Sequence, residues 1–177
     1  LARREWKIPH DEFVAIFVGS AYGPNVQAAN FIAQQLAPRL PNVLFVIAGG
    51  VGEAVNCTST NLRITGVLSE QEKIQLLHSA DIALNPMQAG SGTNVKMFDF
   101  MAMRLPVVTT AIGARGIEYG GEHPFLVTDA SVQAFVDAIE KLRADVSLRQ
   151  RVGDAARHCV EDDYAWERIS AQLGCFL

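Results

Sequence analysis

Two continuous apolar runs, Phe13–Val18 and Val43–Ala48, constrain the fold of this chain more than any other feature. Neither run has a polar position that would face water, and this pattern is typical of a parallel strand covered on both faces. Between them, apolar residues recur at helical spacing. A strand, a helix and a second strand in this order predict a βαβ unit, and therefore a parallel sheet.

The rest of the chain continues the same alternation. We expect further strands at residues 62–65, 81–85, 106–109 and 125–128. Asn25 is expected to cap the helix after the first strand, Ser69 and Glu72 to form a capping box, and Ser131 to cap a later helix. The helix after Ser69 is expected to bury Ile74 and Leu77. Two last helices are expected at residues 148–159 and 166–173. The predicted fold class is α/β: a doubly wound, mostly parallel sheet of six strands with flanking helices.

Glycine-rich turns follow several of these strands. They lie at Gly19–Gly23, Gly49–Gly52, Gly90–Gly92 and Gly113–Gly116. Because the carboxyl ends of parallel strands meet at one edge of a sheet, all of these turns should gather on one rim. Ligands of doubly wound sheets bind beyond that rim, where the strand order reverses. The convergence of the turns therefore predicts a binding site without reference to any family.

One of these turns has the features of an anion site. Gly90, Ser91, Gly92 and Thr93 lead into a helix whose first backbone N–H groups have no partner within the helix. We expect the N–H groups of Thr93, Asn94 and Val95 to hold a phosphate, assisted by the helix dipole. The helix is apolar on nearly every side and is expected to be deeply buried, yet it carries Lys96 and Asp99. Unpaired charges on such a helix suggest a ligand.

Composition excludes several classes of protein. The 177 residues suit one domain, with 49% hydrophobic residues, 19% charged residues and a net charge of −4. This charge argues against a nucleic-acid surface. No apolar stretch reaches the roughly 20 residues of a membrane span. The three cysteines lack metal-type spacing and suggest a reduced, cytoplasmic setting. Because the chain opens without a methionine, we expect a fragment of a longer protein.

The stretch from Gly90 to Thr110 resembles the retaining GT-B glycosyltransferases of family four. The resemblance rests on Gly90–Thr93 with Lys96 and Asp99 downstream, and then on residues 101–102 and 106–110. Other matching stretches are residues 17–20, 24–25, 47–50, 64–66, 79–82 and 164–167. Residues from about Phe13 onward therefore look like the C-terminal, donor-binding half of that family, which has a Rossmann-like fold. Residues 1–177 would form this single domain, and the N-terminal acceptor domain would be absent.

The resemblance implies roles for particular residues. Asp99, about 9 Å along the helix axis from the phosphate site, would accept hydrogen bonds from the ribose hydroxyls. The family more often has a second acid near the donor sugar, where this chain has Ser91. Many relatives also have an arginine and a lysine in the turn after the first strand, where this chain has Gly19, Ser20, Tyr22 and Asn25. Asn25 is about as well explained as a plain helix cap.

The positive charge that a diphosphate needs must then come from elsewhere. We propose Lys96 and Arg115 as its source, although the loop that contains Arg115 is equally well explained as a mobile surface loop. In relatives the base lies between the Gly49–Gly52 turn and the segment that here contains Ile64. No metal is expected, since the sequence has no paired-aspartate motif and the relatives balance phosphate charge with the helix dipole and basic side chains.

The predicted function is donor binding for an enzyme that moves a sugar from a nucleoside diphosphate to an acceptor hydroxyl with retained configuration. The expected partners are a nucleotide sugar and the protein's own acceptor domain, with no nucleic acid and with peripheral membrane contact only through the missing half. This piece alone should bind nucleotide without transferring sugar. Two alternatives stay open: a GT-B epimerase or phosphorylase, and a non-catalytic binding module with a vestigial site.

Overall fold

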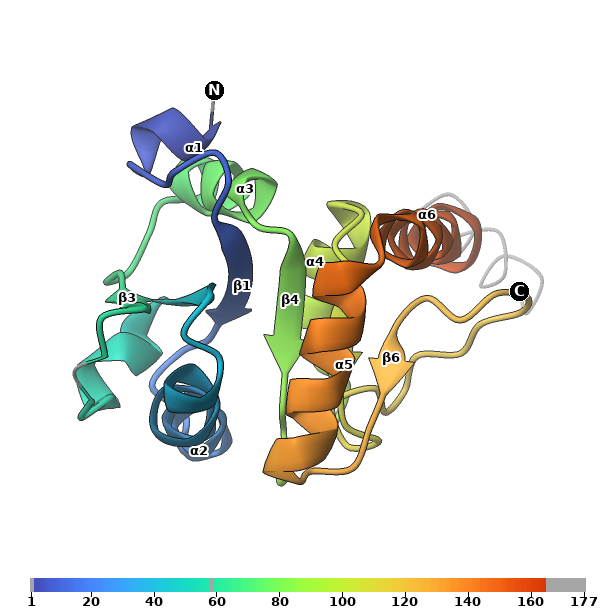
Figure 1. Ribbon diagram of the computed structural model, residues 1–177. Helices are drawn as coiled ribbons and strands as arrows, with labels where there is room; N and C mark the ends of the chain where they lie inside the picture. The colour runs from blue at the N-terminus through green and yellow to red at the C-terminus, as the bar shows by residue number, and fades with distance from the viewer. Residues whose placement is uncertain (1, 58, 165–177) are drawn as a thin grey trace.

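The strands of the computed structural model, which describes residues 2–57 and 59–164, form one sheet in the order β3-β2-β1-β4-β5-β6 (Figure 1). Every neighbouring pair is parallel. The strand bounds are β1 Phe13–Val18, β2 Val43–Ala48, β3 Leu62–Ile64, β4 Ile82–Asn85, β5 Val107–Thr109 and β6 Leu126–Val127. The predicted six-stranded, doubly wound α/β fold is therefore confirmed, and each predicted strand is present with ends that differ by at most a few residues.

Helices cover both faces of the sheet (Figure 1). One face packs against α2, its continuation η1 and α5, and the other packs against α3, α4 and α6. The helical bounds are α1 Ala2–Glu5, α2 Gly23–Phe31, η1 Ile32–Leu36, η2 Ala37–Arg39, η3 Gly50–Ala54, α3 Glu70–Ser79, α4 Lys96–Ala102, α5 Val132–Ala144 and α6 Val146–Asp163.

Alternate residues of the central strands supply the two halves of the core. On β1, Ala15 and Phe17 face the layer of α2 and α5, whereas Val14 and Ile16 face the layer of α3 and α4. All four are buried almost completely. Two buried faces explain why these runs are apolar at every position. Phe31 and Phe135 join α2 to α5 through an edge-on ring contact of 5.5 Å.

The strand order reverses between β1 and β4. From β1 the chain moves outward through β2 to β3, and from β4 it moves in the opposite direction through β5 to β6. A crevice forms at such a point because the connections leave neighbouring strands in opposite directions. The turns after β1 and β4 border this crevice, and the turn after β4 is the one that the sequence predicted to bind phosphate.

The helix after β1 corrects the prediction for Asn25. The helix α2 begins at Gly23 with Pro24 in its first turn, and its N-cap residue Tyr22 makes no side-chain cap. Asn25 thus lies inside the helix and is only 8% exposed. Proline fits the first helical turn because its φ is already helical and it needs no hydrogen-bond acceptor there. The sequence placed the helix start too late because it favoured asparagine over proline as the signal.

The other caps largely follow the sequence. Ser69 and Glu72 form the predicted capping box, and the Ser131 side chain accepts from the N–H of Ala134. In α3, Leu77 is buried as expected, but Ile74 is 37% exposed. The helix predicted from residue 148 begins two residues earlier, at Val146, because Asp145 caps it through the N–H of Leu148. The helix predicted at residues 166–173 lies outside the described residues.

The expectation that α4 is deeply buried is only half right. Met97, Phe100 and Met101 are buried, but Val95, just before the helix, is 72% exposed. The helix is seven residues long. One side packs on the sheet and on α6, while its first turn opens onto the rim. The apolar composition of this segment therefore reflects packing on one side only.

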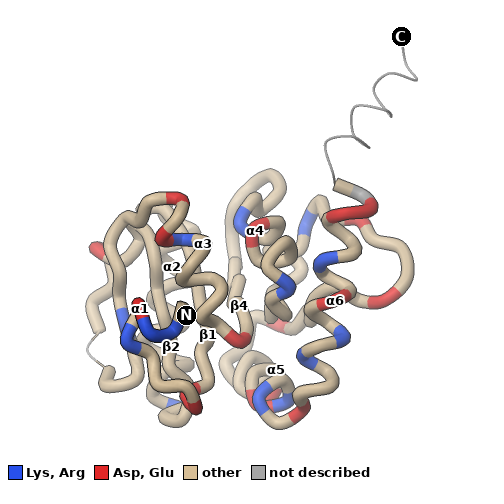
Figure 2. The backbone as a smooth tube through the Cα atoms, turned by 90° about the horizontal axis from the view of Figure 1, so that it is seen from above, with Lys and Arg blue, Asp and Glu red and all other residues tan. Residues whose placement is uncertain are grey.

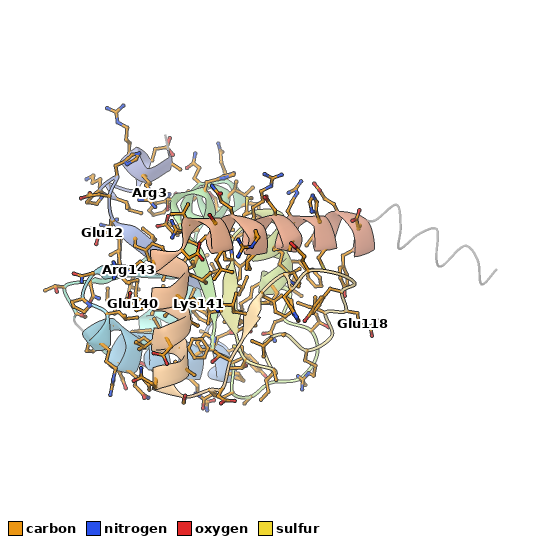
Figure 3. The ribbon with its side chains drawn as sticks, turned by 45° about the vertical axis from the view of Figure 1, so that its right-hand side comes forward. Arg3, Glu12, Glu118, Glu140, Lys141 and Arg143 are labelled. Atoms are coloured by element: carbon orange, nitrogen blue, oxygen red, sulfur yellow. The ribbon has the colours of Figure 1, made fainter. Side chains whose placement is uncertain are left out.

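Charged residues do not gather in one large patch on the described surface. Figure 2 shows basic and acidic residues interspersed along α5 and α6. On α5, Glu140 and Arg143 pair at 2.8 Å, and Figure 3 shows both with Lys141 on the same helix. Pairs of this kind contribute little to stability because water screens them. No helix in the described ranges combines the length and apolar character required to cross a bilayer.

Candidate functional site

A pocket of about 360 Å³ lies at the reversal of the strand order. Its walls come from the turn after β1, the turn after β4 and the first turns of α4. The lining residues are Val18, Gly19, Ser20, Tyr22, Asn25, Met87, Ala89, Gly90, Ser91, Thr93, Asn94, Val95, Lys96 and Asp99. Most of the residues that the sequence predicted for the site thus line one pocket.

The turn from Gly90 to Thr93 has the backbone conformation that its glycines permit. Gly90 has φ of 123° and Gly92 has φ of 78°, both in the region that side chains disfavour. In the described part of the chain, the N–H groups of Thr93, Asn94 and Val95 donate to no protein acceptor. The N-cap residue Val95 provides no side-chain cap either. These donors are therefore available to an anion in the pocket.

Because α4 has only seven residues, its dipole is small, and a side chain must supply most of the positive charge. The nearest is Lys96, whose Nζ donates to Oδ1 of Asn25 at 2.7 Å. The ammonium also lies 4.3 Å from the centre of the Phe17 ring. Burial lowers the pKa of Lys96 from 10.5 to about 8. An anion in the pocket would favour the charged form of this lysine.

Asp99 lies one turn further along α4 but does not pair with Lys96. Its Oδ2 accepts from Nζ of Lys73 at 3.1 Å, and Lys73 also contacts Glu70 at 3.0 Å. Burial acts to lower the pKa of Lys73, but the hydrogen bonds and the negative charges of Glu70 and Asp99 together outweigh it, so the pKa is raised. The Asp99 side chain is 43% exposed, so it can still accept hydrogen bonds from a ligand.

Arg115 approaches the glycine turn from the loop after β5. Its Nη2 donates to the carbonyl oxygens of Gly90 at 2.8 Å and Gly92 at 3.3 Å. The next residue, Gly116, has φ of 79°, and a Cβ there would overlap the Thr93 hydroxyl. Arg115 is not among the residues that line the pocket, so its observed role is to hold the turn from outside.

Two other predicted residues lie on the same rim with different surroundings. Gly19 is buried, its N–H donates to Ala48 O at 3.0 Å, and its carbonyl accepts from Val51 at 3.1 Å. A Cβ on Gly49 would overlap that carbonyl, so the turns after β1 and β2 are locked together. Ile64 ends β3, is 40% exposed and packs against Gly52 rather than lining the pocket.

The sequence did not predict three residues that support the site. Phe17 was assigned to the core alone, Lys73 was not singled out, and Asn25 was expected to be either a cap or a ligand contact, not a partner of Lys96. Lys73 is 26 positions from Asp99, and Asn25 is 71 positions from Lys96. No local pattern indicates such pairs. Only the parallel arrangement, which starts α2, α3 and α4 at one edge of the sheet, brings them together.

Metal-ligating side chains do not cluster in the described residues: no group of three or more His, Cys, Asp or Glu is placed to hold an ion. None of the four histidines lines the pocket, and His123 contacts Tyr119 at 2.8 Å. The polar groups that the pocket presents are backbone N–H donors, hydroxyls, the side-chain amides of Asn25 and Asn94, one ammonium and one carboxylate. Such a set binds phosphate and sugar hydroxyls.

The sheet order and the pocket at its reversal define a doubly wound, Rossmann-like α/β domain. A family model described as "Glycosyl transferases group 1" matches residues 12–145. The chain belongs to this family. The match contains the whole pocket, including both ends of the glycine turn and the start of α4.

Curated relatives agree with this assignment. The chain is 31% identical to D-inositol 3-phosphate glycosyltransferase of Corynebacterium aurimucosum, over 97% of this chain and 44% of that protein. It is 29% identical to the capsular polysaccharide biosynthesis glycosyltransferase CapM of Staphylococcus aureus, over 60% of this chain and 29% of that protein. The chain therefore spans less than half the length of these relatives.

Solved structures share the fold. Sucrose-phosphate synthase from Thermosynechococcus elongatus aligns over 99% of this chain and 47% of its own, with a TM-score of 0.79 and 20% identity. Anabaena Alr3699/HepE, solved in complex with UDP and glucose, aligns over 98% of this chain and 50% of its own, with a TM-score of 0.75 and 15% identity. Both structures resemble this chain over about half of their length.

Proposed function

We propose that this chain is the donor-binding domain of a retaining glycosyltransferase and that its pocket holds the diphosphate and ribose of a nucleotide sugar. The observation that carries the proposal is the combination of unpartnered N–H groups and the desolvated Lys96 in a pocket where the strand order reverses. Family membership supports the same conclusion, and the bound UDP of Alr3699/HepE makes UDP the first nucleotide to test.

Each end of the pocket has its own task. At one end, the N–H groups of Thr93, Asn94 and Val95 bind the distal phosphate, and Lys96 balances its charge. When the bond from the sugar to this phosphate breaks, the departing oxygen gains negative charge, and donors that are already in place stabilise it. Asp99 accepts hydrogen bonds from the ribose hydroxyls with its orientation fixed by Lys73.

The sugar end of the pocket has no acid at position 91. Ser91 is exposed and offers a hydroxyl to the donor sugar. We propose that a second domain binds the acceptor, since the curated relatives are more than twice as long as the segment that aligns with this chain. The chain by itself therefore binds the donor without transferring its sugar.

The test is a calorimetric titration of the chain with UDP, GDP and ADP. We expect at least one diphosphate to bind, and the uncharged nucleoside with the same base to bind at least about tenfold more weakly because it lacks the charge-assisted hydrogen bonds. Binding of no diphosphate would contradict the proposal and would favour a module with a vestigial site. Sugar transfer by the chain alone would contradict the need for a second domain.

A further inference from the structure

Asn25 is a buried polar side chain that the prediction as a helix cap does not explain. It lies inside α2 and is 8% exposed. Buried amides are retained at a cost in desolvation unless hydrogen bonds replace the lost water. The hydrogen bonds of Asn25 therefore indicate what this residue does.

Two of these bonds stay within the segment after β1, and the third crosses the pocket to α4. Nδ2 of Asn25 donates to the carbonyl and hydroxyl oxygens of Ser20, at 3.2 Å and 3.3 Å. Oδ1 accepts from Nζ of Lys96 at 2.7 Å. The orientation of the amide is determined by chemistry, because an ammonium group only donates and must face the oxygen. Asn25 thus connects the turn after β1 to the lysine of α4.

The neutrality of Asn25 matters as much as its position. The Lys96 ammonium has Asn25 and the Phe17 ring as partners, and neither carries a charge. The other ionisable groups around it are Tyr22, the Asp99 carboxylate that pairs with Lys73, and Arg115 on the outer side of the turn. A carboxylate at position 25 would hold the ammonium more tightly but would cancel its charge. An amide fixes the ammonium and leaves the charge for an anion.

We propose that Asn25 is a positioning residue for the donor diphosphate: its amide holds the Lys96 ammonium in the pocket as an uncompensated charge and fixes the turn of Ser20 to the same point. This proposal rests on the proposed function. It assigns to a neutral side chain of α2 the task of orienting a cation that comes from α4. One lysine held in this way provides the positive charge that phosphate binding requires.

The test compares UDP affinity in the wild-type chain and in Asn25→Ala, Asn25→Asp and Asn30→Ala. Asn30 is the matched control, because it lies on the same helix, is half-buried and donates to Ala54 O at 3.4 Å, away from the pocket. We expect Asn25→Ala to weaken UDP binding about tenfold, the size of one lost charged hydrogen bond, and Asn30→Ala to leave it unchanged. A thermal unfolding transition in each variant would show that the variant is folded.

The pH dependence of UDP binding in the aspartate variant distinguishes a positioning role of Asn25 from a purely structural one. It has nearly the same shape as asparagine, but its negative charge favours the charged form of Lys96. We expect UDP to bind at least about tenfold more weakly at pH 7.5, and the pH at which binding is lost to move upward from about 8. Titration of the Lys96 side chain by NMR, without nucleotide, should show the same upward movement.

The outcomes separate this proposal from the one on which it rests. If the wild-type chain binds no diphosphate, the proposed function fails, and the role of Asn25 fails with it. If the wild-type chain binds UDP while Asn25→Ala and Asn25→Asp bind equally well with the same pH midpoint, only the role of Asn25 is overturned. Should Asn25→Ala fail to fold, the aspartate variant and the Lys96 titration decide by the same criteria.

Discussion

The two ends of the parallel strands differ in how their polar groups are paired. We call the end where the strands begin the amino edge of the sheet, and the end where they finish the carboxyl edge. At the amino edge, Arg3 donates to Glu12 O at 2.7 Å and to Asp81 at 2.7 Å, and Asp81 also accepts from Val14 N at 2.8 Å. Figure 3 shows Arg3 and Glu12 close together at this end of the molecule. At the carboxyl edge, the N–H groups of residues 93–95 have no protein acceptor among the described residues, and Lys96 is desolvated.

This difference shows how the fold separates stability from binding. Polar groups that pair with one another stabilise the folded chain. Groups without a hydrogen-bond partner or an opposite charge instead favour the binding of a ligand that provides the partner and the charge. Changes at the amino edge should therefore alter the free energy of unfolding without altering nucleotide affinity. Changes at the carboxyl edge should do the reverse.

The largest effect is expected at the amino edge. Asp81→Ala removes the acceptor of both Arg3 and the N–H of Val14, and Val14 is completely buried. We expect the free energy of unfolding to fall by about 3 kcal/mol, because a buried donor loses a charged acceptor. Urea denaturation measures this loss, with the exposed Asp11→Ala as control. UDP affinity of the folded fraction should not change, and a large loss of affinity would contradict the separation of the two edges.

Replacing the lysine at the carboxyl edge should have the opposite effect. We expect Lys96→Met to weaken UDP binding about 30-fold, the equivalent of about 2 kcal/mol for a charged hydrogen bond. Stability should be unchanged or slightly higher, because the folded chain no longer desolvates an ammonium group. Calorimetry and urea denaturation measure the two quantities. Lys141→Met, on the exposed side of α5, is the matched control. Equal affinity in the wild-type chain and Lys96→Met would remove Lys96 from the site.

The same lysine should make binding depend on pH. Burial lowers the pKa of Lys96 to about 8, and a diphosphate binds the protonated form, so affinity should fall as pH rises above 8. The loss should approach about tenfold per pH unit until the lysine of the complex also loses its proton. In the absence of nucleotide, the free energy of unfolding should rise over the same range, because the folded chain favours the neutral form. Affinity of Lys96→Met should be flat between pH 7.5 and 9.5, and a parallel fall in that variant would assign the dependence to another group.

The smallest effect is expected for Arg115. It is exposed and holds the carbonyls of Gly90 and Gly92 from outside the pocket. Arg115→Ala should weaken UDP binding only about threefold, as a loosened turn costs part of one hydrogen bond. Arg151→Ala, on the exposed side of α6, is the control for loss of a surface charge. A loss as large as that of Lys96→Met would show that Arg115 contacts the phosphate directly.

Local patterns in the sequence predicted most of the fold and the centre of the site. Apolar runs marked the strands, and Gly90, Gly92, Lys96 and Asp99 indicated the pocket, because a glycine turn before a helix has a local signature. The supporting contacts had no such signature. The sequence explained Asn25 about equally well as a cap or as a ligand contact, and its contact with Lys96 exists only once β1 and β4 lie side by side.

The burial of the α4 segment could not be predicted from its composition. Composition alone suggested that α4 is covered on all sides, yet Val95 faces the open rim. Hydrophobicity indicates that a segment can be buried, but the position of a pocket decides which of its residues are. Exposed apolar residues beside a site therefore cannot be distinguished from core residues by pattern.

The central claim is that a diphosphate binds to the backbone N–H groups of residues 93–95, and amide NMR spectra test it most directly. The chain is titrated in parallel with UDP and with uridine, which lacks the phosphates. We predict that the amide signals of Thr93, Asn94 and Val95 shift with UDP and stay in place with uridine. The amides of α5, which packs on the opposite face of the sheet from α4, should stay in place with both ligands. Binding of UDP that leaves these three amide signals unmoved would contradict the account.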